Sequence, residues 1–358
     1  MIKLYIYLKT SFEWLNQVIF KWAQTTKYDA KGRKWRRTQK EWSLDRNSKQ
    51  ETKKFYRKFG FKNINTVWHS IFSNTYGEFH KEFVSPSQFY SSIEPALNRC
   101  EFEVLQDKKL LYVLFKDFKT PKSIVKNING FYLNDIRICS RDEAVELLNG
   151  LAGFLIKPSL DTGGGRGVEV FHFDDQNDRT KSIIATLEKY KKDFIVQEFL
   201  EQSPELAQFN PTSINTIRII TYIDELNGIQ ILLSALRIGA KGKYVDNSNS
   251  GGVFCNIDKS GHLGKSVFST ELEVRYSTDI GKVTNGERIS SYHKVEDMVK
   301  EMHLHLPYFR MVSWDIAIDG NNEPVLIEFN VTSQGITWQA AAGPLFGKFT
   351  EEILKKVN

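Results

Sequence analysis

Residues 314–330, which read WDIAIDGNNEPVLIEFN, constrain the fold of this chain more than any other stretch. Two runs rich in β-branched and aromatic residues flank a segment dense in turn-forming residues, so we predict a β-hairpin. Residues two apart in a strand face the same side, so Glu328 and Asn330 point together and Asp315 can join them from the partner strand. Two carboxylates and an amide oxygen suit Mg²⁺ that nucleotide phosphates also hold. The alternative is a pair of exposed acids on a surface hairpin.

The length and composition indicate a folded protein of two to three domains or lobes. The chain has 358 residues, of which 41% are hydrophobic and 13% aromatic, enough for a large core. Its three cysteines, Cys100, Cys139 and Cys255, form no CxxC pair, which argues against a disulfide framework or a zinc site and favours the reducing cytoplasm. No apolar run reaches the ~18 residues of a membrane span, and no signal peptide is visible.

The net charge of +6 is concentrated in residues 21–62, where fifteen Lys/Arg face four Asp/Glu. The rest of the chain therefore carries −5. A basic segment of this kind favours an anionic partner, which could be membrane headgroups, an acidic glycan or nucleic acid, and the alternative is a solvated arm. Nothing resembles a zinc finger or RRM, so no nucleic-acid partner is predicted.

Residues 1–24 have apolar residues near helical spacing and predict an amphipathic helix. Such a helix either lies on a membrane surface or packs on its own domain. Residues 25–50 are polar and basic, and we predict a loop or arm there. Peripheral contact with the inner face of the membrane through residues 1–62 is therefore one of two open interpretations.

From about residue 105 the pattern changes to alternating helices and strands. Ser140 and Glu143 form a capping-box signature at the start of one of these helices, and Asn149-Gly150 ends it. We divide the chain into an N-terminal helical and basic region (1–105), a first lobe (106–197) and a second lobe (198–358). The expected helices cover about 108–115, 141–148, 181–191 and 345–356, and the expected strands 123–126, 154–157, 168–171, 194–198, 216–223, 229–238, 253–257, 312–318 and 325–329.

A glycine-rich loop follows the strand that Lys157 closes. The segment 154–171 reads FLIKPSLDTGGGRGVEVF, with glycines at Gly163, Gly164, Gly165 and Gly167. Backbone N–H groups in such a loop can approach phosphate oxygens closely, and a lysine adds a positive charge nearby. A Walker loop would end in Gly-Lys-Ser/Thr and lead into a helix, which this loop does not. The alternative is a flexible hairpin.

Together, these motifs resemble the ATP-grasp superfamily, and most closely the sugar-transfer-associated ATP-grasp proteins, over residues 105–356. The resemblance implies an α+β fold in which two lobes clamp ATP. It also implies that Lys108, in the Asp107-Lys108 pair before Pro121, and Lys157 contact phosphates. The remaining implied roles are adenine contacts from Glu198, Phe199 and Leu200 in the hinge, ribose contact from Glu205, and one or two Mg²⁺ ions on Asp315, Glu328 and Asn330.

The chain departs from the D-alanine ligase pattern at Ser313, where those enzymes place an arginine. We expect Arg218 and Arg237, each on a predicted strand, to supply that charge to the γ-phosphate and the acyl phosphate. A structural salt bridge is the alternative for either one. The resemblance also points to a substrate loop that contains Asp246, Asn247, Gly251 and Gly252, against the alternative of an ordinary polar loop.

The activity that the resemblance implies is ATP-dependent ligation of a carboxylate to an amine. The carboxylate would attack ATP to give an acyl phosphate and ADP, and an amine or amino acid would then displace phosphate to form an amide. The family context suggests an acidic sugar or glycan of polysaccharide or capsule biosynthesis. The alternatives are an amino-acid or peptide ligase without a glycan, an ATP-grasp kinase, and a non-catalytic ATP-binding scaffold.

Overall fold

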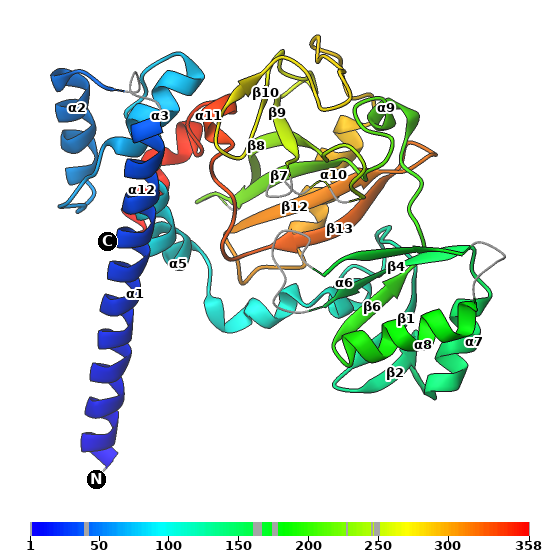
Figure 1. Ribbon diagram of the computed structural model, residues 1–358. Coiled ribbons are helices and arrows are strands. Elements are labelled where there is room, and N and C mark those ends of the chain that lie inside the picture. The colour runs from blue at the N-terminus through cyan, green and yellow to red at the C-terminus, as the bar shows by residue number, and fades with distance from the viewer. Residues whose placement is uncertain are drawn as a thin grey trace.

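The computed structural model describes residues 2–38, 43–159, 167–173, 178–226, 228–244, 246 and 251–357. Helices at the N-terminal end precede two antiparallel sheets, one of six strands and one of seven (Figure 1). This arrangement confirms the α+β fold with two lobes and a helical N-terminal region. Among the described helices, none is both long enough and apolar enough to cross a membrane.

The N-terminal region is more helical than the sequence suggested. The expected helix at 1–24 continues to Thr38, so the prediction of a loop over 25–50 was wrong for most of that segment. The second helix begins directly after Asp45, whose side chain accepts hydrogen bonds from the N–H groups of Asn47 and Ser48. The helices are α1 Ile2–Thr38, α2 Arg46–Arg57, α3 Val67–Tyr76, α4 Pro86–Gln88, a π-helical turn Phe89–Ile93 and α5 Glu94–Leu97.

Contacts with α3 explain why α1 extends through a basic segment. Trp68 is fully buried and donates its indole N–H to the carbonyl of Tyr28 at 3.0 Å. Trp35 meets the Trp68 ring edge-on at 5.2 Å. Gly32 lies so close that a Cβ there would come within 2.8 Å of the Trp68 ring. Tertiary packing along one side therefore holds this polar stretch helical, as it does for most helices in proteins.

The first lobe is built on the six-stranded sheet, in the order β3-β2-β1-β6-β4-β5. Two helices pack on one face of this sheet around a shared core, and the Ser140–Glu143 capping box is present as expected. The strands are β1 Ser123–Ile128, β2 Phe131–Asn134, β3 Arg137–Cys139, β4 Gly153–Pro158, β5 Glu169–His172 and β6 Phe194–Gln197, and the helices are α7 Arg141–Asn149 and α8 Arg179–Tyr190.

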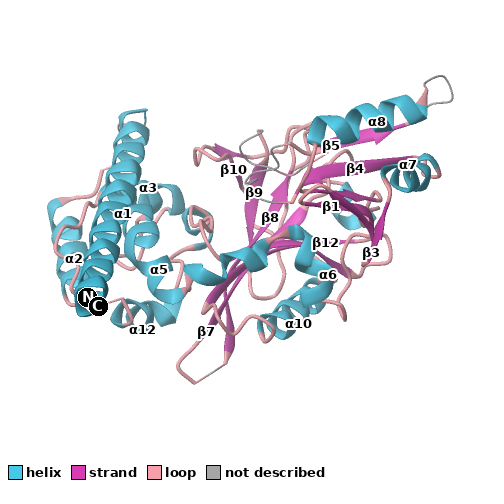
Figure 2. Ribbon diagram, turned by 90° about the horizontal axis from the view of Figure 1, so that it is seen from below, coloured by secondary structure: helices cyan, strands magenta, loops and turns pink. Residues whose placement is uncertain are grey.

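The second lobe is built on the seven-stranded sheet, in the order β11-β10-β9-β8-β7-β12-β13. The helix α10, Tyr292–His303, packs on one face of it, and Figure 2 shows the two lobes on one side of the N-terminal helices. The strands are β7 Thr216–Ile223, β8 Ile229–Ile238, β9 Val253–Ile257, β10 Val267–Phe268, β11 Val274–Arg275, β12 Met311–Ile318 and β13 Pro324–Asn330. The short helices are α6 Leu111–Leu114, α9 Pro204–Ala207, α11 Gln339–Ala342 and α12 Thr350–Lys355.

One hydrophobic core joins the N-terminal helices to the second sheet and to the C-terminal helices. Polar contacts reinforce this junction close to the end of β13. The buried carboxylate of Glu94 accepts hydrogen bonds from the N–H groups of Ser333, at 3.0 Å, and Gln334, at 2.9 Å. The side chain of Asn98 donates to the carbonyls of Met311 and Val331 at 2.7 and 2.6 Å. Residues on both sides of position 105 therefore share this core.

We expect Trp68→Ala to lower the free energy of unfolding by about 3–5 kcal/mol, the usual cost of removing a large buried aromatic side chain. Trp68 is fully buried between α1 and α3, so both helices lose packing. Denaturant titration followed by circular dichroism measures the change. Leu226→Ala is the control, since Leu226 is 91% exposed and its removal should change stability by less than about 0.5 kcal/mol. Equal effects of the two substitutions would contradict this packing.

Candidate active site

Three neighbouring strands of the second sheet place charged side chains side by side. In the strand register, Asp315 on β12 lies opposite Arg218 on β7 and opposite Glu328 on β13. Residues that alternate with them, such as Ile217 and Trp314, belong to the core under α10. Because successive side chains of a strand point to opposite faces, the hydrophobic alternation directs the charged residues to the face away from α10.

Asp315 is the centre of a buried ion-pair network. Its carboxylate accepts two hydrogen bonds from Arg218, one from Nε and one from Nη2 at 2.7 Å, and a third from Arg237 Nη1 at 2.8 Å. Arg237 also pairs with Asp246 at 3.1 Å, and the hydroxyl of Thr216 donates to Asp246. Burial alone would raise the pKa of Asp315, but the two guanidinium groups hold it well below its usual range.

Two lysines of the first lobe meet this network at Glu328. Lys108 Nζ lies 3.5 Å from Glu328 Oε2, and Lys157, the second-last residue of β4, has only 9% of its surface exposed. Burial and the neighbouring charge of Lys108 lower the pKa of Lys157 to about 8, while Glu328 opposes that shift. Lys109 follows directly but turns away and pairs with Asp193 at 3.0 Å. The structure thus brings Lys108 and Lys157, but not Lys109, to Glu328 and the ion-pair network. We call this group the charged cluster; it consists of Lys108, Lys157, Arg218, Arg237, Asp246, Asp315 and Glu328.

The donor set at the end of β13 fits a hard divalent cation. Asp315 and Glu328 supply carboxylates, and Asn330 has a buried side-chain amide nitrogen without a partner among the described residues. The amide nitrogen is a donor and does not bind a cation, but a 180° rotation of the Asn330 amide would put its oxygen in that place, where it could bind one. Within the described residues, no group of three or more His, Cys, Asp and Glu side chains is arranged as a metal site. The predicted cation ligands Asp315, Glu328 and Asn330 are not a group of that kind, because they are two acids and one amide.

The structure places the predicted substrate loop only in part. Asp246 belongs to the ion-pair network described above. Gly251 has a positive φ of +94°, and Gly252 is buried directly before β9. Asn247 and the glycines Gly163, Gly164 and Gly165 lie outside the described residues. Gly167 is described, and its carbonyl accepts a hydrogen bond from the Tyr190 hydroxyl at 2.6 Å.

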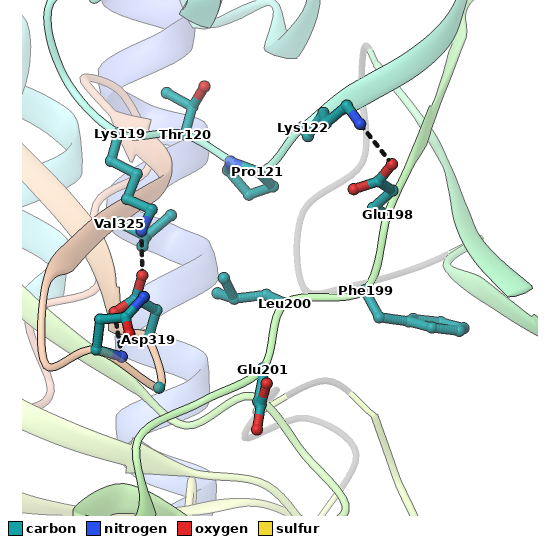
Figure 3. A pocket seen from close by; sticks show the side chains of 12 residues that line it. Lys119, Thr120, Pro121, Lys122, Glu198, Phe199, Leu200, Glu201, Asp319 and Val325 are labelled. Atoms are coloured by element: carbon teal, nitrogen blue, oxygen red, sulfur yellow. Dashed lines mark hydrogen bonds and ion pairs between the residues drawn. The ribbon is translucent and has the colours of Figure 1, made fainter. Parts of the chain in front are cut away.

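The predicted hinge forms one wall of a cavity of about 440 Å³ (Figure 3). Glu198 pairs with Lys122 at 2.7 Å across this cavity, and Lys119 pairs with Asp319. The ring of Phe199 points away from the cavity and stacks on His172 at 4.8 Å. The lining residues are Lys119, Thr120, Pro121, Lys122, Glu198, Phe199, Leu200, Glu201, Asp319, Gly320, Asn321 and Val325. Since no member of the charged cluster lines it, the cavity lies beside the hinge and not at the cluster.

The carboxylate of Glu205 is hydrogen-bonded to Ser290. Its two carboxylate oxygens accept hydrogen bonds from the N–H and the hydroxyl of Ser290, at 2.8 and 3.0 Å. Ser290 lies two residues before the start of α10. This helix covers the face of the second sheet opposite to the face that carries Asp315. The structure therefore does not bring Glu205 to the charged cluster.

Comparison with known proteins identifies the family. A model of the sugar-transfer-associated ATP-grasp family matches residues 87–354, about three quarters of the chain. The chain belongs to the sugar-transfer-associated ATP-grasp family. Membership supports an ATP-binding ligase. A comparison with curated proteins finds no match.

Solved structures with a related fold are only distantly similar to this ATP-grasp protein. The ATP-grasp ligase PsnB, complexed with minimal precursor, Mg and ADP, is 10% identical with a TM-score of 0.41, covering 73% of this chain and 62% of that one. N5-carboxyaminoimidazole synthetase from Staphylococcus aureus, complexed with ADP, is 12% identical (TM-score 0.40; 71% and 50% covered). D-alanine–D-alanine ligase from Bacillus anthracis is 14% identical (TM-score 0.37; 74% and 66% covered). At these levels the structures carry no functional assignment.

Two further residues lie beside predicted site residues and were not predicted from the sequence. Lys126 and Lys157 both lie opposite Ile195 across adjacent strands, so they share one row on the same face of the first sheet. Burial lowers the pKa of Lys126 to about 8, and its Nζ lies 3.1 Å from the Tyr112 ring centre. Trp338 is 6% exposed and lies against the Arg218 guanidinium at 5.9 Å. The strand register reveals the position of Lys126, and the contact with Arg218 reveals that of Trp338. The local sequence around each residue carries no signal for it.

We expect Lys157→Met to weaken ATP binding by about 10–100-fold, which corresponds to the loss of one charged hydrogen bond of about 1.5–3 kcal/mol. The reason is that Lys157 is the buried cation that faces Glu328 and Lys108. Isothermal titration calorimetry measures the affinity. Lys189→Met is the matched control, since Lys189 lies on the outer helix α8 and pairs with Glu169 at 2.6 Å. Unchanged affinity in Lys157→Met would contradict a phosphate role for this lysine.

Proposed function

We propose that this ATP-grasp protein joins a carboxylate to an amine and forms an amide through an acyl phosphate, with cleavage of ATP to ADP and phosphate. The observation that supports this most is the convergence of Lys108 and Lys157 from one lobe with Glu328 and the Asp315–Arg218–Arg237 network from the other. A site of this kind can position a polyanion and stabilise charge in a transition state, which supply most of the catalysis in phosphoryl transfer.

In the first step, a carboxylate oxygen of the substrate attacks the γ-phosphorus of ATP. A new O–P bond forms, the bond between the γ-phosphorus and the β,γ-bridging oxygen breaks, and ADP leaves. Lys108 and Lys157 offset the negative charge of the phosphates, and the glycines Gly163, Gly164, Gly165 and Gly167 cover them. Mg²⁺ held by Asp315, Glu328 and Asn330, as one or two ions, would neutralise further phosphate charge.

In the second step, the amine nitrogen attacks the carbonyl carbon of the acyl phosphate. A C–N bond forms, the C–O bond to the phosphate breaks, and the departing phosphate accepts the proton that the nitrogen loses. Arg218 and Arg237 stabilise the developing oxyanion and the departing phosphate. Arg237 retains a buried Nε–H without a partner among the described residues, so it has a donor to spare beyond its bonds to Asp315 and Asp246. The adenine would lie against the hinge residues Glu198, Phe199 and Leu200. The ribose would contact Glu205, since each carboxylate oxygen that accepts from Ser290 can accept one further hydrogen bond.

The proposed substrates are an acidic sugar or glycan and an amine or amino acid, in polysaccharide or capsule biosynthesis. Support for the sugar comes from the description of the family as sugar-transfer-associated. The loop with Asp246, Asn247, Gly251 and Gly252 is proposed to hold the acceptor. An amino-acid or peptide ligase, an ATP-grasp kinase and a non-catalytic scaffold are the competing functions, and product analysis separates them.

The decisive test places ¹⁸O in the carboxylate of the substrate. If an acyl phosphate forms, one labelled oxygen should appear in the released phosphate, because the C–O bond to that oxygen breaks in the second step. A screen of uronic acids and amino acids in pairs for ADP release first identifies the substrate, and mass spectrometry then follows the label. Label retained wholly in the organic product, or release of AMP and pyrophosphate, would contradict this mechanism. A stable phosphoester without amide would indicate the kinase.

We expect Glu328→Gln to lower turnover by about 10²–10³-fold or more, the scale on which loss of one charge-stabilising group acts. The substitution removes a carboxylate that faces Lys108 and completes the proposed cation site, while the fold stays intact because its side chain is 31% exposed. Glu323→Gln on the same hairpin is the control, since Glu323 pairs only with Lys294 at the surface, at 2.6 Å. Steady-state ADP release at varied Mg²⁺ measures the effect. Near-normal turnover in Glu328→Gln would remove the site from consideration.

A further inference from the structure

We propose that the exposed half of α1 docks on the surface of an anionic phospholipid bilayer. The second half of this helix is fixed to the rest of the protein. There Tyr28 stacks on Tyr90 at 4.4 Å, Asp29 accepts a hydrogen bond from Ser87, and Trp35 meets Trp68. Residues 12–23 are exposed throughout, and Figure 1 shows the first half of α1 extending well beyond the other helices.

The exposed half carries an unusual density of large apolar side chains. Seven of them within residues 12–22 are between 43% and 68% exposed: Phe12, Trp14, Leu15, Val18, Ile19, Phe20 and Trp22. At about 100° per residue, all but Phe20 fall within an arc of about 160° of the helix surface. An exposed apolar patch of this size marks an interaction site and not a surface that faces water.

The same face becomes cationic further along the helix. Eighteen residues correspond to five full turns, so residues eighteen apart lie on the same side. Three exposed arginines each follow an apolar residue of the patch at this spacing: Leu15 and Arg33, Val18 and Arg36, Ile19 and Arg37. One side of α1 therefore presents aromatic and aliphatic groups, followed by guanidinium groups.

Charge complementarity decides between a lipid surface and a second copy of this chain. Residues 2–38 contain nine Lys/Arg and two Asp/Glu, a local charge of +7. A second α1 would bring the same charge and repel the first, whereas anionic headgroups attract it. Two tryptophans in the patch suit the boundary between headgroups and acyl chains, where such rings are enriched. A broad apolar face with adjacent cations is the pattern of helices that lie in this boundary.

This inference does not depend on the proposed ligase activity. The first half of α1 lies apart from the first lobe (Figure 1), and none of the residues that form the patch belongs to the charged cluster. Variants in the patch should therefore leave ATP affinity unchanged, which provides an internal check that each variant is folded.

The test is flotation of the purified full-length protein with vesicles of phosphatidylcholine containing 30% phosphatidylglycerol. We expect binding to these vesicles, at least about tenfold weaker binding to pure phosphatidylcholine, and weakening as the ionic strength rises, because the screening length falls below about 8 Å above physiological salt. The double variant Leu15→Glu/Ile19→Glu should bind at least tenfold more weakly. Asn16→Glu/Gln17→Glu adds the same two charges away from the centre of the patch and should retain binding.

A second measurement avoids any effect on folding. Brominated acyl chains should quench the fluorescence of the bound protein, and Trp14→Phe/Trp22→Phe should lose most of that quenching while it still floats with the vesicles. Equal binding of the two glutamate variants, or no flotation of the unmodified protein, would overturn the proposal. A dimer in analytical ultracentrifugation that Leu15→Glu/Ile19→Glu dissociates, without vesicle binding, would assign the patch to a second copy instead.

Discussion

The carboxylate of Asp315, held between Arg218 and Arg237, is the interaction on which the site depends. Removing charges from water is costly, and only mutual pairing with good hydrogen-bond geometry offsets that cost. Here three hydrogen bonds reach one carboxylate that is 2% exposed, and Asp246 pairs with the remaining side of Arg237. The network therefore fixes the positions of β7, β8 and β12 relative to one another as well as the charges of the site.

Asp315 supports both the fold and the site, and in this it differs from Glu328. Loss of the Asp315 carboxylate would leave the buried Arg218 guanidinium without the acid it pairs with and would leave Arg237 with Asp246, and breaking a buried ion pair typically costs about 3–5 kcal/mol of stability. Glu328 has a side-chain exposure of 31% and pairs with Lys108 at 3.5 Å, so its loss changes the chemistry more than the fold. Of the two carboxylates among the three proposed cation ligands, Glu328 is thus the one whose substitution reports on function. The four cations, Lys108, Lys157, Arg218 and Arg237, outnumber the three acids, which prepares the site for an anion such as a nucleotide phosphate.

The sequence predicted what depends on local pattern and missed what depends on distant contacts. The hairpin at 314–330 was predictable because β-branched runs flank a turn, and α7 because its cap is encoded within four residues. The continuation of α1 was not, because Gly32 and Trp35 act only when Trp68 packs against them. The strands β2 and β3 were missed as well, since both are short and β3 forms an edge of the sheet.

The candidate site divides in the same way. Asp315, Glu328 and Lys157 have positions that motif spacing indicates, and the fold brings them together. Lys126 gains its place only through the register of β1 on β6, and no motif surrounds it. Glu205 satisfies the expected spacing from the hinge, yet Ser290, which is 85 residues away, accounts for both of its oxygens. Motif spacing predicts the position of a residue in the sequence. Its hydrogen-bond partner can come from a distant segment, about which the spacing carries no information.

The N-terminal helices belong to the same physical unit as the site. Their aromatic residues share one core with β7, β8 and the C-terminal helices, so removing them would expose a face of the second sheet. The carboxylate of Glu94 holds the N–H groups of Ser333 and Gln334, only three and four residues beyond Asn330. The family match begins at residue 87, within this helical region and not at the first strand, which agrees with a core that the two parts share. A surface bound through α1 would therefore be connected to the end of β13 through packed side chains and not through a flexible linker.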